Sequence, residues 1–140
     1  MSGLKDSSGI RVYYSTNLRE HDAGVLQVGD GSLRLAGSQI DSGLSSWSFD
    51  CPASCFESNW PDQDYHILSV QLHMHQVGTA MSMKQFRDGE EIKDVTTEFY
   101  DFRFQDVNEA SETDGMIIRH GDSFRTEVSE QIWARNTADM

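Results

Sequence analysis

Three of the chain's five histidines fall in the stretch HILSVQLHMHQVG, residues 66–78, and two of them, His73 and His75, are separated by one residue. In a β-strand such a pair projects from one face, roughly 7 Å apart along the strand. Two imidazoles on a rigid strand can bind one metal ion, which a third ligand or a water completes. The spacing also fits two solvated histidines on an exposed face, since H-x-H is a weak motif.

Strand alternation over residues 66–75 divides this stretch into two faces. The apolar face, which we expect to meet the core, holds His66, Leu68, Val70, Leu72 and Met74. The polar face holds Ile67, Ser69, Gln71, His73 and His75. We therefore expect His66 to be a hydrogen-bonded core histidine and not a metal ligand.

Sulfur-containing side chains are the other candidates for chemistry. Met81 and Met83 share one face of the next predicted strand, and thioether sulfur favours copper over zinc or magnesium. Methionine also fills gaps in cores, which is the role we expect for Met74. Cys51 and Cys55, in FDCPASC, lack the closer spacing and the second pair of a common metal site. They fit free thiols, a strained disulfide with each other, or bonds to groups outside this chain.

Short alternating runs separated by turn residues predict the elements that must position these side chains. Strands are predicted at residues 10–15, 24–29, 32–37, 45–51, 65–75, 79–87, 96–106, 116–120 and 123–128. Residues 52–64 and 107–115 are predicted as loops, residues 87–91 and 121–122 as turns, and the aromatic residues Tyr100, Phe102 and Phe104 as core. This pattern predicts an all-β fold, an antiparallel β-sandwich or jelly roll, as a single domain over residues 1–140.

The composition argues against several classes of partner. The 140 residues carry a formal net charge of −12 and a pI of about 4.6, so the surface repels nucleic acid. No apolar run approaches the roughly 20 residues of a transmembrane helix. The start, MSGLKDSSG, lacks the apolar stretch of a signal peptide. These features indicate a soluble protein or one domain of a larger one.

An ordered series of motifs points to a family. Residues 6–29, DSSGIRVYYSTNLREHDAGVLQVG, precede the C-x3-C pair and the H-x-H stretch with its glycine. RDG at 87–89, YDFRFQ at 100–105 and GD at 121–122 follow. Over about residues 6–128 the series resembles the C-terminal catalytic domain of copper type II, ascorbate-dependent monooxygenases. This family includes dopamine β-hydroxylase, the nearer branch, and peptidylglycine α-hydroxylating monooxygenase.

The resemblance implies a jelly-roll-like sandwich in which His73 and His75 bind a copper ion. At that copper the family activates dioxygen and hydroxylates a small organic substrate. A methionine well downstream supplies the family's third ligand, and Met140, in TADM, is the candidate at a shorter spacing. Beyond Val128 the resemblance fades, and residues 129–140 form a tail of unclear structure. Electrons come from ascorbate through a second copper in a preceding domain, so this chain alone would not be self-sufficient as an enzyme.

The resemblance also bears on the cysteines and on location. In the dopamine β-hydroxylase branch the C-x3-C cysteines pair with cysteines farther downstream, which these residues do not include. Cys51 and Cys55 are then free, joined to each other, or bonded to another chain. The family is secretory and works in oxidising surroundings, which implies a secretory or extracellular location.

The sequence is also compatible with two alternative functions. The chain can be a non-catalytic β-sandwich that serves as an interaction or structural subunit of a larger assembly, with edge strands that pair with other protein chains. It can also hold zinc, which needs a tetrahedral ligand set. His120 would contribute to that set only if the fold brings it close to His73 and His75.

Overall fold

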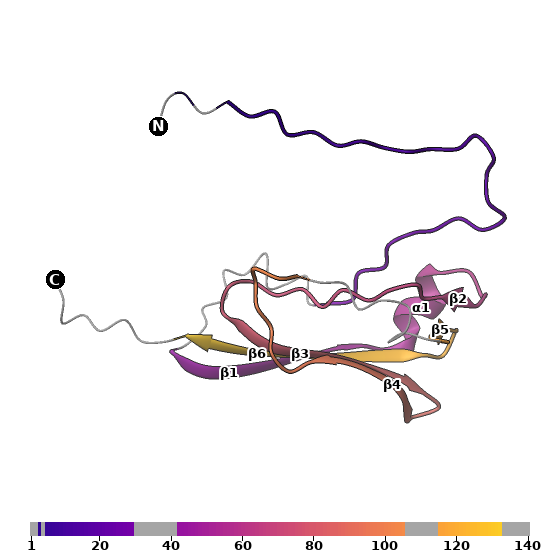
Figure 1. Ribbon diagram of the computed structural model, residues 1–140. Helices are drawn as coiled ribbons and strands as arrows, with labels where there is room; N and C mark the ends of the chain where they lie inside the picture. Colours follow the sequence, from indigo (N-terminus) through magenta and orange to yellow (C-terminus); the bar gives the residue numbers. More distant parts are fainter. Residues whose placement is uncertain (1–2, 4, 30–41, 106–114, 133–140) are drawn as a thin grey trace.

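The computed structural model describes residues 3, 5–29, 42–105 and 115–132 (Figure 1). A four-stranded antiparallel sheet contains β1 (Gly43–Cys51), β3 (Gly78–Arg87), β4 (Glu90–Thr97) and β6 (Ser123–Ile132), in the order β1-β6-β3-β4. The short strands β2 (Tyr65–His66) and β5 (Ile117–Ile118) form a second antiparallel sheet. One helix, α1 (Ala53–Asn59), follows β1.

The small sheet, α1 and the extended residues that follow β2 lie along one face of the large sheet, as Figure 1 shows. The described part of the chain is therefore all-β apart from one short helix, in a sandwich-like arrangement. This confirms the predicted fold class. The two layers pack together because a sheet face that carries apolar side chains needs a second layer to bury them.

The core lies between the two layers. Cross-strand pairing aligns Met83 of β3 with Val95 of β4 and Thr126 of β6, so that these side chains share the inner face. Phe124 is 1% exposed, and its ring centroid lies 5.4 Å from that of Phe56 in α1. The buried members of the core cluster are Phe56, Leu72, Met83, Val95, Met116, Ile118 and Phe124. Burial of each such side chain stabilises the fold by about 1.5–3 kcal/mol.

The opposite face of the large sheet carries charged pairs. Arg125 of β6 donates to Asp50 of β1 at 2.7 Å, and Lys84 of β3 lies 3.3 Å from Glu91 of β4. All four side chains are partly exposed. Each pair therefore contributes little to stability, about 0–1 kcal/mol. An antiparallel sheet with one apolar and one polar face suits a layer that meets the core on one side and water on the other.

The predicted loop at residues 52–64 is wrong in part, because it contains α1. Pro52 is the residue before the helix, and Pro61 follows the helix-terminating Trp60, whose N–H donates to the Phe56 carbonyl. Seven helical residues are too few to show a helical period in the sequence. The buried Phe56 ring, packed on Phe124 and 6.0 Å from Trp60, provides the tertiary contact that stabilises so short a helix.

The predicted strands at 10–15 and 24–29 are also wrong. Both runs are extended but pair with no strand in the described part of the chain. Ile10, Val12 and Tyr14 are 93%, 73% and 88% exposed. Figure 1 shows this N-terminal segment running away from the sheet. Alternation reports a tendency to be extended, but a strand also needs a hydrogen-bonding neighbour.

The middle of the chain departs from the prediction in two places. Only Tyr65–His66 of the predicted strand 65–75 forms a strand, and residues 67–75 run extended beside the sheet. The predicted strand at 96–106 is displaced to β4, residues 90–97, because Asp88 and Gly89 form a two-residue turn. Their φ angles of 53° and 83° are those of a tight hairpin turn, so pairing resumes at Glu90.

The remaining predictions divide between confirmed strands and residues outside the described ranges. The strands predicted at 45–51, 79–87 and 123–128 lie within β1, β3 and β6, and β5 lies within 116–120. The strand predicted at 32–37, nearly all of the loop at 107–115 and most of the tail fall outside the described residues. In the ranges that the structure describes, no helix has the length and apolar character needed to cross a membrane.

Candidate metal centre

The H-x-H residues lie on the extended segment that crosses the inner face of the large sheet. Leu72 and Met74 are 5% and 4% exposed, whereas His73 and His75 are exposed to solvent. Alternation therefore places these four side chains as predicted. Val70 is half-buried and packs against the core.

The two imidazoles lie next to each other. Their ring centroids are 5.6 Å apart and the ring planes are inclined at 77°. Two imidazoles that share one metal through Nε2 place their centroids up to roughly 6.4 Å apart, given metal–nitrogen bonds of about 2.0–2.1 Å. The observed centroid spacing of 5.6 Å lies within this limit.

His73 has a specific hydrogen-bond partner in Gln105. Nδ1 of His73 lies 2.6 Å from Oε1 of Gln105, while Nε2 of Gln105 donates to the Phe102 carbonyl at 3.0 Å. An amide oxygen only accepts, so Nδ1 of His73 donates. The proton then sits on Nδ1, and the lone pair of the neutral ring is on Nε2. This is the arrangement in which metal-binding histidines are usually held.

Tyr100 holds the peptide between the two histidines. Its hydroxyl donates to the Met74 carbonyl at 2.6 Å and accepts from the Met74 N–H at 3.1 Å. The Tyr100 N–H in turn donates to the Thr79 carbonyl at 2.8 Å, in β3. The backbone that carries His73 and His75 is thereby tied to the large sheet.

A shallow cavity of about 300 Å³ opens beside His75, lined also by Gln76, Val77 and Phe102. The Phe102 ring centroid lies 6.4 Å from that of His75, with the planes inclined at 62°. The cavity can therefore bring a small molecule with an apolar part next to this imidazole.

The glycine that follows the histidines is a close-packing position. The Gly78 N–H donates to the His75 carbonyl at 2.9 Å, which closes the turn into β3. A Cβ atom at Gly78 would lie 2.6 Å from Cβ of Met74 and 2.8 Å from its sulfur. The turn can thus pack against Met74 only because residue 78 has no side chain.

The RDG and GD motifs meet where the end of β3 approaches the turn between β5 and β6. Asp122 is 0% exposed and accepts from Nε and Nη2 of Arg87 at 2.7 and 2.9 Å. It also accepts from Nε2 of Gln85 at 2.7 Å and the Arg119 N–H at 2.8 Å. Burial by itself raises the pKa of Asp122, but these hydrogen bonds, Arg87 first, hold the pKa below its usual value.

Cys51 and Cys55 are both free thiols in the structure, at the end of β1 and in α1. Cys51 is half-buried and Cys55 is exposed. Burial, and then hydrogen bonding with Cys55, raise the pKa of the Cys51 thiol to about 11. Cys51 is therefore protonated and a poor nucleophile at neutral pH.

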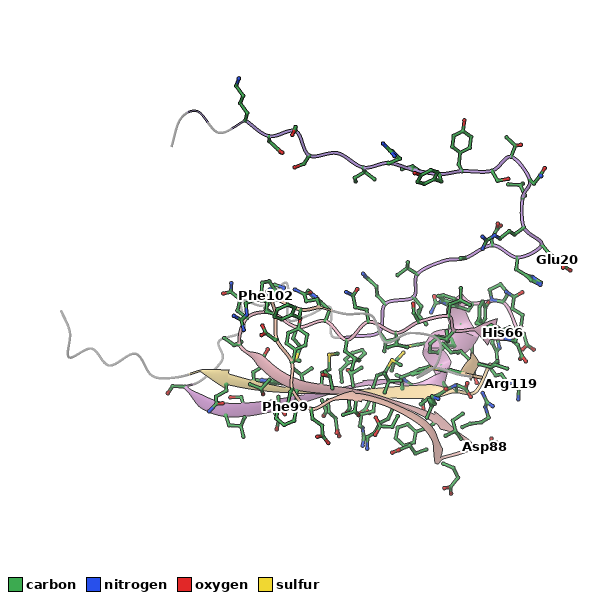
Figure 2. All side chains as sticks on the ribbon, viewed as in Figure 1. Glu20, His66, Asp88, Phe99, Phe102 and Arg119 are labelled. Atoms are coloured by element: carbon green, nitrogen blue, oxygen red, sulfur yellow. The ribbon has the colours of Figure 1, made fainter. Side chains whose placement is uncertain are left out.

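The other two histidines considered from the sequence, His66 and His120, lie away from this pair. His66, expected in the core, is exposed; this prediction is wrong, because the alternation shifts by one residue between Ile67 and Val70. Figure 2 shows His66 at the opposite end of the molecule from Phe102. His120 donates from Nε2 to the Trp60 carbonyl at 2.9 Å, beyond α1. Met140 lies outside the described residues.

The residues that contact the histidines are not the ones that the sequence predicts. The prediction that Tyr100, Phe102 and Phe104 are core residues is wrong in part, because Phe102 and Phe104 are 38% and 71% exposed and Tyr100 is half-buried. Alternation predicts no role for Gln105. The signal that could have found them is the YDFRFQ motif itself, since it accompanies H-x-H in the family pattern.

Among the described residues, the candidate ligands at this place are the two imidazoles. The described residues contain no group of three or more His, Cys, Asp or Glu side chains placed to hold an ion. Within the described ranges, the pair is therefore not part of the closed tetrahedral ligand set of a structural zinc site. Two imidazole nitrogens can be completed by a sulfur ligand, water or a substrate, and copper accepts such a ligand set.

Comparison with known proteins identifies the family of this chain. Residues 21–138 match the sequence model of the copper type II ascorbate-dependent monooxygenase, C-terminal domain. Because this match covers most of the chain, the chain belongs to that family.

Particular relatives support the same assignment. The chain is 29% identical over 97% of its length to DBH-like monooxygenase protein 2 of Mus musculus. It is 34% identical over 89% to DBH-like monooxygenase protein 1 of Gallus gallus, and 28% identical over 99% to dopamine beta-hydroxylase of Canis lupus familiaris. These matches cover 22%, 21% and 22% of the relatives, so the chain spans about a fifth of their length.

Proposed function

We propose that this chain is the copper-binding, substrate-hydroxylating domain of a dopamine β-hydroxylase-like monooxygenase, with His73 and His75 as copper ligands. The observation that carries the proposal is the pair of adjacent exposed imidazoles, of which His73 is hydrogen-bonded through Nδ1. The family resemblance implies a methionine as third ligand, and Met140 is the candidate for it at a shorter spacing than in the family. Copper supplies the activation of dioxygen for hydroxylation of a small organic substrate when it is bound.

The residues of this chain would bind the copper ion and exclude part of the water around it. His73 and His75 present nitrogen lone pairs, and Gln105 fixes the orientation of the His73 ring. The cavity beside His75 and Phe102 would receive the substrate and exclude part of the water around it. Ascorbate would be the reductant, acting through a second copper domain, so hydroxylation would need that domain as well. The site of action would be the secretory pathway or the extracellular space.

Copper titration of histidine variants tests this proposal. We expect His73→Ala and His75→Ala each to weaken copper binding by more than about 100-fold, because even the hydrogen-bond partners of ligands are worth about 10- to 100-fold. The measurement is isothermal titration together with the electron paramagnetic resonance spectrum of the bound ion, whose nitrogen couplings report imidazole ligation.

His66→Ala is the matched control, since His66 is exposed and distant from the pair. It should bind copper as the wild type does. Equal copper affinity and an unchanged spectrum in the double variant lacking His73 and His75 would refute the ligand assignment.

A non-catalytic interaction module is the second candidate, favoured by one observation. Between residues 10 and 25, six large apolar side chains are each at least 73% exposed: Ile10, Val12, Tyr13, Tyr14, Leu18 and Val25. Extended backbone with such side chains is suited to pair with a sheet edge of another protein chain. If this were the function, Val12→Lys would abolish partner binding in sedimentation experiments, whereas loss of both histidines would leave it intact.

A further inference from the structure

We propose that residues 100–105 act as a histidine clamp, in which Tyr100 and Gln105 are positioning residues for the two imidazoles. The inference deepens the proposed function and rests on it for the role of copper. The clamp contacts three consecutive residues of the H-x-H segment: Gln105 holds His73, Tyr100 holds Met74, and Phe102 packs against His75.

The Tyr100 hydroxyl replaces the strand pairing that this segment lacks. Residues 71–75 form no strand, yet Met74 is only 4% exposed, so its backbone N–H and C=O need partners inside the protein. One hydroxyl satisfies both groups by donating to the carbonyl and accepting from the N–H. Because Tyr100 is itself bonded to Thr79 of β3, the peptide between the histidines has a fixed place relative to the sheet.

Gln105 sets which nitrogen of His73 carries the proton. Its amide could rotate by half a turn, but donation from Nε2 to the Phe102 carbonyl fixes Oε1 toward His73. The loop that presents Gln105 is held by Asp101, which accepts from the Arg103 N–H at 2.9 Å and from the Phe104 N–H at 2.8 Å through its carbonyl. The proton of a neutral His73 is then confined to Nδ1, which leaves Nε2 ready to bind a metal.

Nuclear magnetic resonance of the copper-free protein tests the clamp without any metal. At about pH 8, where imidazole is neutral, His73 should be the Nδ1–H tautomer in the wild type. In Gln105→Ala the Nε2–H tautomer should predominate. Gln105→Glu keeps an acceptor and should restore Nδ1–H. In Tyr100→Phe, hydrogen exchange of the Met74 amide should become fast, while the His73 tautomer is retained.

Copper titration of the same variants links the clamp to the metal. Gln105→Ala should weaken copper binding about 10- to 100-fold, the usual effect of losing such a partner. Gln63→Ala and Tyr14→Phe are matched controls at exposed positions outside the clamp and the H-x-H segment, and they should change neither the His73 tautomer, Met74 amide exchange nor copper affinity.

The two proposals fail in different ways. An unchanged His73 tautomer in Gln105→Ala, or a Met74 amide that stays protected in Tyr100→Phe, would overturn the clamp. A wild-type protein that binds no copper but shows both effects would overturn the proposed function and support the clamp as a device that orders the imidazoles.

Discussion

At the scale of single residues, two polar contacts join sequence motifs that lie far apart in the chain. Gln105 orients His73, and Arg87 neutralises the buried Asp122. In both cases a residue of one motif meets a residue of another: YDFRFQ meets H-x-H, and RDG meets GD. A buried carboxylate without its counter-charge destabilises the folded state, so the contact between Arg87 and Asp122 mainly affects the free energy of unfolding.

Asp122→Asn is expected to lower the free energy of unfolding by about 3 kcal/mol, because it leaves the Arg87 guanidinium without its counter-charge. The folded-state pKa of Asp122 is lowered, so its stabilisation is present above the unfolded-state pKa near 3.9 and is lost as pH falls through the folded-state value. Urea denaturation of both proteins should show a constant difference at neutral pH that shrinks in acid.

Asp50→Asn is the control for that measurement. Asp50 pairs with Arg125 at the same 2.7 Å, but both side chains are about half exposed. The variant should lose no more than about 1 kcal/mol. Equal losses in the two variants would contradict the view that burial makes the Asp122 contact important.

At the scale of elements, the site depends on a segment that is extended but forms no strand. Residues 67–75 obtain their position from Leu72 and Met74 in the core, from the Tyr100 hydroxyl, and from the turn at Gly78. The turn brings the segment directly into β3, the strand that pairs with both β4 and β6. The histidines are therefore linked to a strand that is paired on both sides within the described sheet.

Gly78→Ala is expected to displace Met74, since the new Cβ would lie 2.6 Å from a side-chain atom near the backbone. We expect a loss of about 1–3 kcal/mol, as for overpacking in a core, and a change in the signals of both His73 and His75. Thermal unfolding and the imidazole resonances would measure this. Gly24→Ala, where a Cβ meets nothing within 4 Å, should change neither.

At the scale of the whole molecule, the described chain combines a packed sandwich-like body with an N-terminal segment that makes few contacts. Leu26 and Val28 pack against the core, but the preceding residues are exposed (Figure 2). The chain spans about a fifth of its relatives' length.

Limited trypsin digestion should reveal this division. Cleavage after Arg11 and Arg19, in the exposed extended segment, is expected before cleavage after Arg125, which lies within β6 and pairs with Asp50. Mass spectrometry of early products identifies the order. Early cleavage after Arg125 with residues 1–19 still attached would mean that the N-terminal segment is protected.

The sequence by itself determined the family, the fold class, the strands β1, β3 and β6, and the common orientation of His73 and His75. These follow from local alternation and ordered motifs, because a side chain's face depends on its immediate neighbours. The predictions of a strand at residues 10–15, of a buried His66 and of core positions for the YDFRFQ aromatic residues were wrong. Alternation does not determine which neighbour an extended segment packs against or pairs with. Only the tertiary structure decided that Tyr100 and Gln105 hold the H-x-H segment and that Arg87 meets Asp122, since these contacts join residues 26 to 35 positions apart.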